Sequence, residues 1–272
     1  MAPPPSSTAG KGDFPWWLVV AATIAVFLAV QIAINDLYSQ IFTVVSRGVW
    51  ITIFVTLVGF VLATLFGLLL AVMGLSNSLA LRQTARFYVE IIRGIPILVL
   101  LFYIAFVGAP GFVIAWNALM SPLIEVGVIG ELLVRDVSLL WRAIIALTIG
   151  YSAFISEVFR AGILAVDQGQ IEAAKALGLT RLQRFRLIVL PQAIRTILPP
   201  LGNDFIAMIK DSSLVSVLGV LDITQLGKVT AAGNFRYFET YNVVALLYLI
   251  MTVSLSLLLR RFEARLNRRH GT

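Results

Sequence analysis

Residues 49–75 read VWITIFVTLVGFVLATLFGLLLAVMGL, and no charged side chain occurs anywhere from residue 48 to residue 81. Because an α-helix rises about 1.5 Å per residue, roughly 20 apolar residues cross the hydrocarbon core of a bilayer. A helix that is apolar on every side is also unsuited to the surface of a soluble domain. The stretch therefore predicts a transmembrane helix.

The composition extends this prediction to the whole chain. Of 272 residues, 59% are hydrophobic and 13% are charged, and the mean hydropathy is +0.94. Soluble domains carry roughly 25% charged residues. The alternating segments of a transmembrane barrel do not occur, so we expect an all-α, polytopic membrane helix bundle. The chain has no cysteine, and its single histidine, His270, has no partner ligands nearby in the sequence. We therefore expect neither a metal site nor a catalytic site.

Five further segments are long enough to cross, which gives about six transmembrane helices in total. They comprise residues 16–34, 89–107, 138–160, 192–221 and 241–259. Residues 192–221 include two prolines and several charged side chains, so hydropathy alone does not decide their case. Residues 108–136 contain glycine and proline breaks, and we expect an interfacial or re-entrant segment there.

The distribution of basic residues predicts the orientation. Most of the 21 Lys and Arg residues fall in segments that lie inside if both ends of the chain are cytoplasmic, including the arginine cluster at 260–269. Without a crossing at 192–221, that cluster would lie outside. We thus predict a disordered cytoplasmic N-terminus at 1–15, an added helix and external linker at 16–47, a main transmembrane domain at 48–260 with a cytoplasmic loop at 167–191, and a basic cytoplasmic tail at 261–272.

The segment IEAAKALGLTRLQRFRLIVLPQ, residues 171–192, is a basic and helix-forming interruption between apolar runs. Residues 172–177 are mostly strong helix formers, and Gly178 is a typical residue just past a helix end. A second helix is expected after Thr180, a suitable N-cap, and it should stop at Pro191. The small alanines would let another protein approach closely. The alternative is an ordinary amphipathic helix on the lipid headgroups.

The spacing within this segment resembles the EAA loop of permease subunits of ABC importers: Glu-Ala-Ala, three residues, Gly178, nine residues, Ile188, one residue, then Leu190-Pro191. Other stretches resemble the polar amino acid branch of these permeases: YVEIIRGIPILVLLFYIAF, SEVFRAGILAVDQGQIEAAKALG, LPPLGNDFIAMIKDSSLVSVLGV and LLRRFEARL. Two features depart from the family pattern. Residues 16–34 add a helix, and AVDQGQ lacks a proline that is frequent near Asp167.

The resemblance implies a type I, MetI-like importer core in the bacterial cytoplasmic (inner) membrane. It also implies three kinds of partner: ATPase subunits that hold ATP and Mg, a second permease subunit, identical or homologous, and an external binding protein for polar amino acids. The residues that would couple the permease to the ATPase are Glu172, Ala173, Ala174, Gly178, Leu190 and Pro191.

The chain itself carries no nucleotide-binding motif. A P-loop reads GxxxxGK[ST], but Gly10-Lys11 is followed by glycine and Gly227-Lys228 by valine. We therefore expect that this chain is not an ATPase. An ion-coupled secondary carrier is the main alternative, but no internal repeat supports it and the docking loop would then have no role. A membrane enzyme would need a convergent catalytic set, which the sequence lacks.

Polar residues also occur inside predicted spans, where they are costly and usually face a cavity or the bundle interior. They are Glu157, Asn203, Asp204, Lys210, Asp211, Ser212 and Ser213. In one interpretation they line the path of a zwitterionic substrate through a broken helix. In the other, they only neutralise structural partners.

Overall fold

The computed structural model describes residues 16–268, so the segment predicted to be disordered, 1–15, and the last residues of the basic tail lie outside the described residues. No strand is found between residues 16 and 268. The helices are α1 (Trp16–Ile34), α2 (Asp36–Val45), α3 (Gly48–Gly74), α4 (Leu79–Gly94), α5 (Ile97–Tyr103), the π-helix η1 (Ile104–Gly108), α6 (Ala109–Glu125), the 3₁₀-helix η2 (Val134–Asp136), α7 (Leu139–Leu164), α8 (Gln168–Ala176), α9 (Arg181–Arg184), the π-helix η3 (Phe185–Val189), α10 (Leu190–Asp211), the 3₁₀-helix η4 (Ser212–Leu218), α11 (Ile223–Asn234) and α12 (Tyr237–Arg268).

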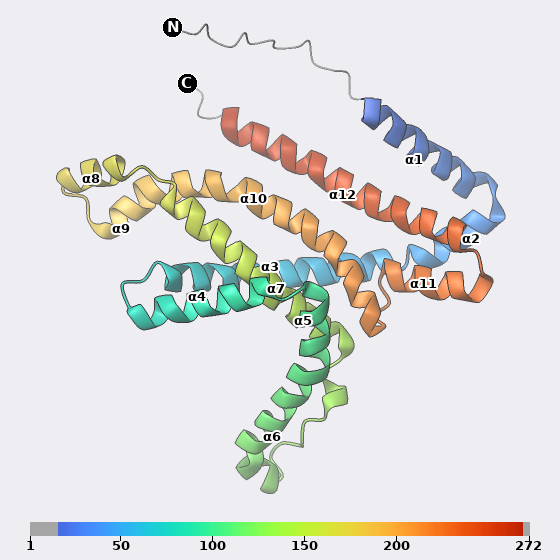
Figure 1. The fold of residues 1–272 in the computed structure, drawn as a ribbon, viewed down its shortest axis with the longest axis horizontal. Helices are drawn as coiled ribbons and strands as arrows, with labels where there is room; N and C mark the ends of the chain where they lie inside the picture. Colours follow the sequence, from blue (N-terminus) through green and yellow to red (C-terminus); the bar gives the residue numbers. More distant parts are fainter. Residues whose placement is uncertain (1–15, 269–272) are drawn as a thin grey trace, which may run out of the picture.

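The centre of the bundle is the crossing of α3 and α7 (Figure 1). Along α3, Gly59, Ala63 and Gly67 recur every four residues and are buried. A Cβ atom added to Gly67 would lie 3.0 Å from both Ile155 Cγ2 and Ser152 O of α7. Small residues let helix backbones approach closely in a membrane, where helix association depends on packing contacts. This stripe of small residues explains why α3 and α7 form the main helix pair.

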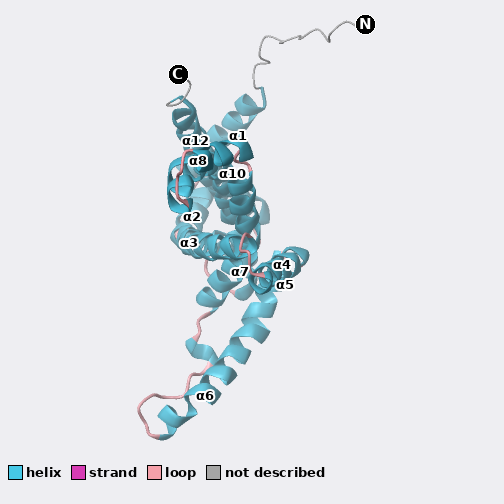
Figure 2. Cartoon of the chain, turned by 90° about the vertical axis from the view of Figure 1, so that its left-hand side faces the viewer, coloured by secondary structure: helices cyan, strands magenta, loops and turns pink. Residues whose placement is uncertain are grey.

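The α5–η1–α6 segment leaves this centre and extends away from the other helices in both views (Figures 1 and 2). The prediction of a span at 89–107 followed by an interfacial segment was wrong in its bounds. Helix α4 ends at Gly94, before Pro96, and one continuous apolar span runs from Ile97 to Glu125. The preceding residue, Ile95, is extended because the proline ring disfavours helical backbone there.

Two other prolines, Pro110 and Pro191, were expected to interrupt helices, but the helix continues through each. The two π-helices explain why. Pro110 follows η1 by two residues, and Pro191 follows η3 by two residues. A π turn already interrupts the usual hydrogen-bond register, so the missing proline N–H falls at a junction and the helix continues. The prediction that the cytoplasmic helix stops at Pro191 was therefore wrong: η3 continues directly into α10.

A second hydrophobic cluster lies where α1 and α2 meet α11 and α12. Its buried members include Tyr38, Ile41 and Val45 of α2 and Ile223, Val243 and Leu247 of the other two helices. The added N-terminal segment is thus a hairpin of two helices packed on the end of the chain, and the expected linker at 35–47 is the amphipathic helix α2.

A buried polar network closes the start of α3 against α11. Asp222, the N-cap of α11, is fully buried and accepts hydrogen bonds from Gln225 N (2.8 Å) and Tyr248 OH (3.1 Å). Ile223 N donates to Thr52 Oγ1 at 3.4 Å. Burial raises the pKa of the Asp222 carboxyl, while these hydrogen bonds act in the opposite direction. Gly48 lies so close to this turn that an added Cβ would sit 2.4 Å from Ile223 N.

Four helical stretches of the described chain are long and apolar enough to cross a membrane: Asp36–Gly74, Ile97–Glu125, Leu139–Leu164 and Tyr237–Ala264. Two other helices are not among these four. In α1 the apolar part, Val19–Ile34, is too short, and α10 is too polar. The path of six crossings with both ends inside remains a prediction.

Cysteine labelling tests this topology cleanly, because the sequence contains no cysteine. We expect single cysteines at Ser39 and Asn234 to react with an impermeant maleimide added to intact cells, since both exposed positions lie at the predicted outer end. A cysteine at Ser78, in the turn between α3 and α4, should react only after permeabilisation. The reverse labelling pattern would contradict the orientation.

Candidate functional site

The segment α8–α9 forms a compact helical loop at the end of α7, and its bounds follow from local caps. Asp167 begins α8 by accepting hydrogen bonds from Gly169 N (2.7 Å) and Gln170 N (3.3 Å). Gly178 ends it with a φ of +78°, a conformation that glycine adopts without strain. Thr180 and Gln183 cap α9 reciprocally. The sequence predicted the glycine end of α8 and the Thr180 cap of α9, whereas the start of α8 at Asp167 was not predicted.

The loop is fastened to the start of α10. Gln192 Nε2 donates to Gln170 Oε1 at 2.6 Å and to Ile188 O at 3.0 Å. Ala174 is 3% exposed, because α8 turns this side chain toward its own chain, against η3. The expectation that both alanines form an outward docking face thus fits Ala173, which is exposed, but not Ala174.

The outward surface of this loop instead presents two leucines that the sequence reading did not single out. Leu177 is 80% exposed and Leu182 is 74% exposed. Glu172, Lys175 and Leu190 of the same segment are also exposed. Large apolar side chains this exposed on a polar loop are candidates for a contact surface.

Within the bundle, α10 and α7 bring several of the predicted polar residues together. Tyr151 of α7 donates a hydrogen bond to Asp211 Oδ2 at 2.7 Å. Asp204 lies on the same side of α10, two turns earlier, and its buried Oδ2 has no hydrogen-bond partner among the described residues. Two carboxylates and a phenol are therefore arranged where α10 packs against α7. Tyr151 was not predicted, since a tyrosine in an apolar helix carries no distinctive signal.

The other predicted residues of α10 differ in their surroundings. Asn203 and Lys210 are exposed on the helix. Ser212 is buried and donates to Ile209 O at 2.7 Å, so its hydroxyl serves the backbone of the broken helix end. Ser213 is partly buried in η4.

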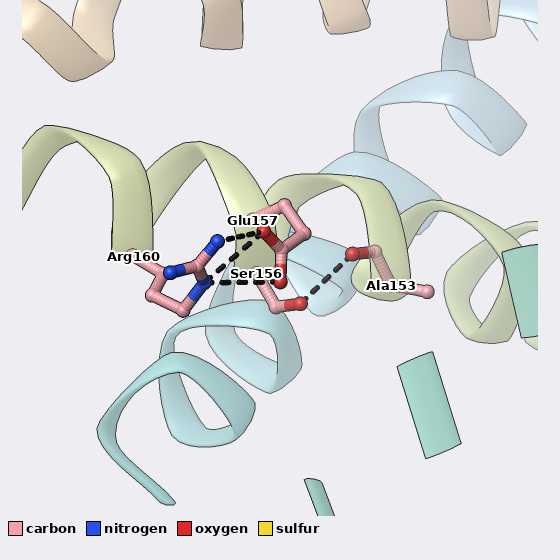
Figure 3. Close-up of polar contacts among 4 residues, drawn as sticks. All are labelled: Ala153, Ser156, Glu157 and Arg160. Carbon is pink, nitrogen blue, oxygen red and sulfur yellow. Dashed lines mark hydrogen bonds and ion pairs between the residues drawn. The ribbon is translucent and has the colours of Figure 1, made fainter. Parts of the chain in front are cut away.

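Glu157 is separate from the α10 residues. Its carboxylate forms an ion pair with Arg160 of the same helix, with Nη2 to Oε2 at 2.6 Å and Nε to both oxygens at 3.1 Å (Figure 3). The pair borders a cleft between α3, α4 and α7, where Arg82, Arg86 and Arg93 also lie. The predicted polar set therefore divides into two places in the fold.

Comparison with known proteins identifies the architecture. The family of binding-protein-dependent transport system inner membrane components matches residues 63–271. The chain belongs to this family. It is a membrane-embedded permease subunit of an ABC importer, and membership supports this function over the ion-coupled carrier.

Individual relatives agree with the family match. The permease is 34% identical over 231 residues to the probable amino-acid permease protein YxeN of Bacillus subtilis, covering 85% of this chain and 95% of the relative. It is 34% identical over 220 residues to the glutamine transport system permease protein GlnP of Escherichia coli, covering 81% and 91%.

Solved structures confirm the MetI-like fold. A chain from an amino acid ABC transporter crystallised with histidines superposes with a TM-score of 0.68 at 36% identity, covering 84% of this permease and 95% of that chain. A chain of the inward-facing MetNI methionine transporter gives a TM-score of 0.62 at 24% identity, covering 82% and 96%, and supports the fold alone.

Proposed function

We propose that this permease imports polar amino acids across the bacterial cytoplasmic (inner) membrane, powered by separate ATPase subunits that bind ATP and Mg. The observation that carries the substrate class is the 36% identity to a subunit of an amino acid ABC transporter, together with relatives named as amino-acid and glutamine permeases. An external amino-acid-binding protein and a second permease subunit, identical or homologous, complete the proposed importer.

The α8–α9 loop is the proposed contact with the ATPase. Glu172, Ala173, Leu177 and Leu182 face outward, so they would make the direct contacts. The other predicted coupling residues would hold the loop in its conformation. Ala174 packs α8 against its own chain, Gly178 forms the left-handed end of α8, and Leu190 with Pro191 forms the junction with α10. The hydrogen bonds of Gln192 to α8 and η3 would pass a displacement of the loop into α10.

The proposed substrate path follows the polar side of α10. Asp204, Asp211 and Tyr151 offer acceptors for an ammonium group, and Asn203, Lys210 and Ser213 offer donors for a carboxylate. Ser212 would shape the broken end of the helix. Buried polar groups in a membrane helix that ends near its polar residues are typical of transport sites. Glu157, predicted on the same path, is engaged by Arg160, so the path proposed here comprises the α10 residues and Tyr151.

The second permease subunit would cover the projecting α5–η1–α6 segment. Phe106, Phe112 and Leu119 are 58%, 54% and 72% exposed along it. The segment contacts the bundle mainly through its first half, at α7. A helix of this length gains stability in a membrane from packing against another helix.

Reconstitution tests the proposed function. We expect uptake of a radiolabelled amino acid such as glutamine into proteoliposomes only when ATPase subunits, internal ATP with Mg, and the binding protein are all present. The chain alone should give no uptake, even under an imposed proton or sodium gradient, because an ABC permease takes its energy from ATP hydrolysed by separate subunits and not from an ion gradient. Gradient-driven uptake by the chain alone would contradict the proposal. Uptake by the complete complex of a substrate other than amino acids would contradict only the substrate class.

A further inference from the structure

Three arginines of α4 lie on one side of the helix, beside its buried face. Arg82, Arg86 and Arg93 are spaced by four and seven residues, which places them within a narrow arc. The buried face next to them carries Ala85 and Val89. Helix α4 is held to α7 by Tyr88, whose hydroxyl donates to Ile149 O at 2.9 Å. The arginine row is therefore fixed in position relative to α7.

The arginine row borders a cleft of about 580 Å³ that is closed on its other sides by the end of α3, the α3–α4 turn and α7. Its polar lining also includes Ser76, Asn77, Glu90 and the pair Glu157–Arg160. Within the described residues, that pair is the one ion pair in the cleft. Because Glu157 is neutralised by Arg160, three arginines remain against one carboxylate, that of Glu90, and the cleft has an excess of positive charge.

The three remaining guanidinium groups are only lightly engaged by the protein. Arg82 makes one long hydrogen bond to Ser76 O, at 3.4 Å. Arg93 lies 5.7 Å from the ring centre of Phe154. A guanidinium group presents five N–H donors in a planar fork that matches phosphate oxygens. The cleft therefore offers unused donors to an anion.

Apolar side chains also line the cleft. They come from α3 (Leu70 and Ala71), from α4 (Val89) and from the end of α7, where Leu164 is 50% exposed. The cleft itself lies at the helix ends near the α3–α4 turn, where the chain meets the membrane surface on the side predicted to be cytoplasmic. Such a site suits a ligand with one anionic group and long apolar chains.

We propose that this cleft binds the phosphate headgroup of an anionic phospholipid of the cytoplasmic leaflet, with its acyl chains leaving the cleft past its apolar lining into the membrane. Basic pockets between transmembrane helices on this side of a membrane have the chemistry that such headgroups require. The bound lipid would hold α4 against the ends of α3 and α7 that line the cleft.

Lipid titration followed by native mass spectrometry tests this site on the full-length chain in detergent. We expect phosphatidylglycerol to bind more tightly than phosphatidylcholine. Replacing Arg86→Gln together with Arg93→Gln should weaken phosphatidylglycerol binding about thirtyfold, given the contribution of each basic side chain near an anionic surface. The matched control, Arg260→Gln with Arg261→Gln, removes the same charge from the exposed end of α12 and should leave the dissociation constant unchanged.

A variant that is expected to bind the lipid more tightly distinguishes a change in the binding site from a loss of folding, because a misfolded chain would not bind more tightly. Glu90→Gln removes the remaining carboxylate of the cleft and should tighten phosphatidylglycerol binding about fivefold, on the same scale. Equal weakening by the cleft pair and the control pair would show that only surface charge matters, and would overturn the proposal. Full displacement of the lipid by inorganic phosphate at constant ionic strength would assign the cleft to a soluble anion and would also overturn it.

Discussion

Replacing Leu177 with aspartate should abolish uptake by the assembled importer and release the ATPase subunits during purification. Leu177 is an apolar side chain, 80% exposed at the tip of α8. If it inserts into the ATPase, the variant loses an apolar contact and places a charge in the interface. Truncation of a hot-spot residue at the centre of an interface costs about 2 kcal/mol or more, which corresponds to at least about thirtyfold weaker association.

The measurements are ATPase retention on the purified permease and amino acid uptake in proteoliposomes. Leu221→Asp is the matched control, because Leu221 is 57% exposed near the opposite end of the bundle and should not affect retention. Asp211→Ala should leave the ATPase bound yet reduce uptake, since it removes the acceptor of Tyr151. Full uptake and a bound ATPase in Leu177→Asp would show that the loop only rests on lipid headgroups.

The variant Gly48→Ala should destabilise the permease by about 2 to 4 kcal/mol, at or above the upper end of the usual cost of overpacking. A Cβ atom there would lie 2.4 Å from Ile223 N and 2.5 Å from the backbone carbon of Asp222. Backbone atoms cannot rotate away as a side chain can. Helix α3 must therefore separate from the start of α11, which breaks the hydrogen bond from Ile223 N to Thr52 and disturbs the buried Asp222.

This loss is measured as a lower midpoint of thermal unfolding in detergent and a smaller monodisperse fraction on size exclusion. Gly74→Ala tests whether any glycine of α3 would behave in this way. Gly74 is the last residue of the helix, and no atom lies within 4 Å of an added Cβ. Its replacement should leave stability equal or slightly higher, because alanine favours helix. An equal loss of stability in both variants would show that the close approach of α3 to the start of α11 is not the cause.

Much of this fold could be predicted from local sequence signals. The apolar runs predicted α1, α3, α7 and α12, because a membrane helix must satisfy its backbone internally and cover itself with apolar side chains. Two features of the α8–α9 loop were equally predictable, since Thr180 and Gly178 act through a cap and a backbone angle that depend on few neighbours. Signals that depend on only three or four neighbouring residues can be recognised from the sequence without knowledge of the tertiary structure.

Features that depend on packing could not be read in this way. Pro191 reads as a helix end, but a π turn two residues earlier carries the helix past it, and the sequence does not mark where such turns form. The burial of Ala174 depends on how α8 rotates against η3. Tyr151 becomes part of the candidate path only because α10 brings Asp211 opposite it. In each case the partner is distant along the chain or set by helix rotation.

The hairpin of α1 and α2 has a consequence for the biosynthesis of this protein. Helix α1 leaves the ribosome long before α12, yet Leu28 and Tyr38 belong to the same buried cluster as Val243 and Leu247. Until translation reaches those residues, the apolar side of α2 has no permanent cover. Helices α1 and α2 therefore remain without their final packing partners until α11 and α12 have been synthesised. The bundle closes only on chains that have been translated nearly to their ends.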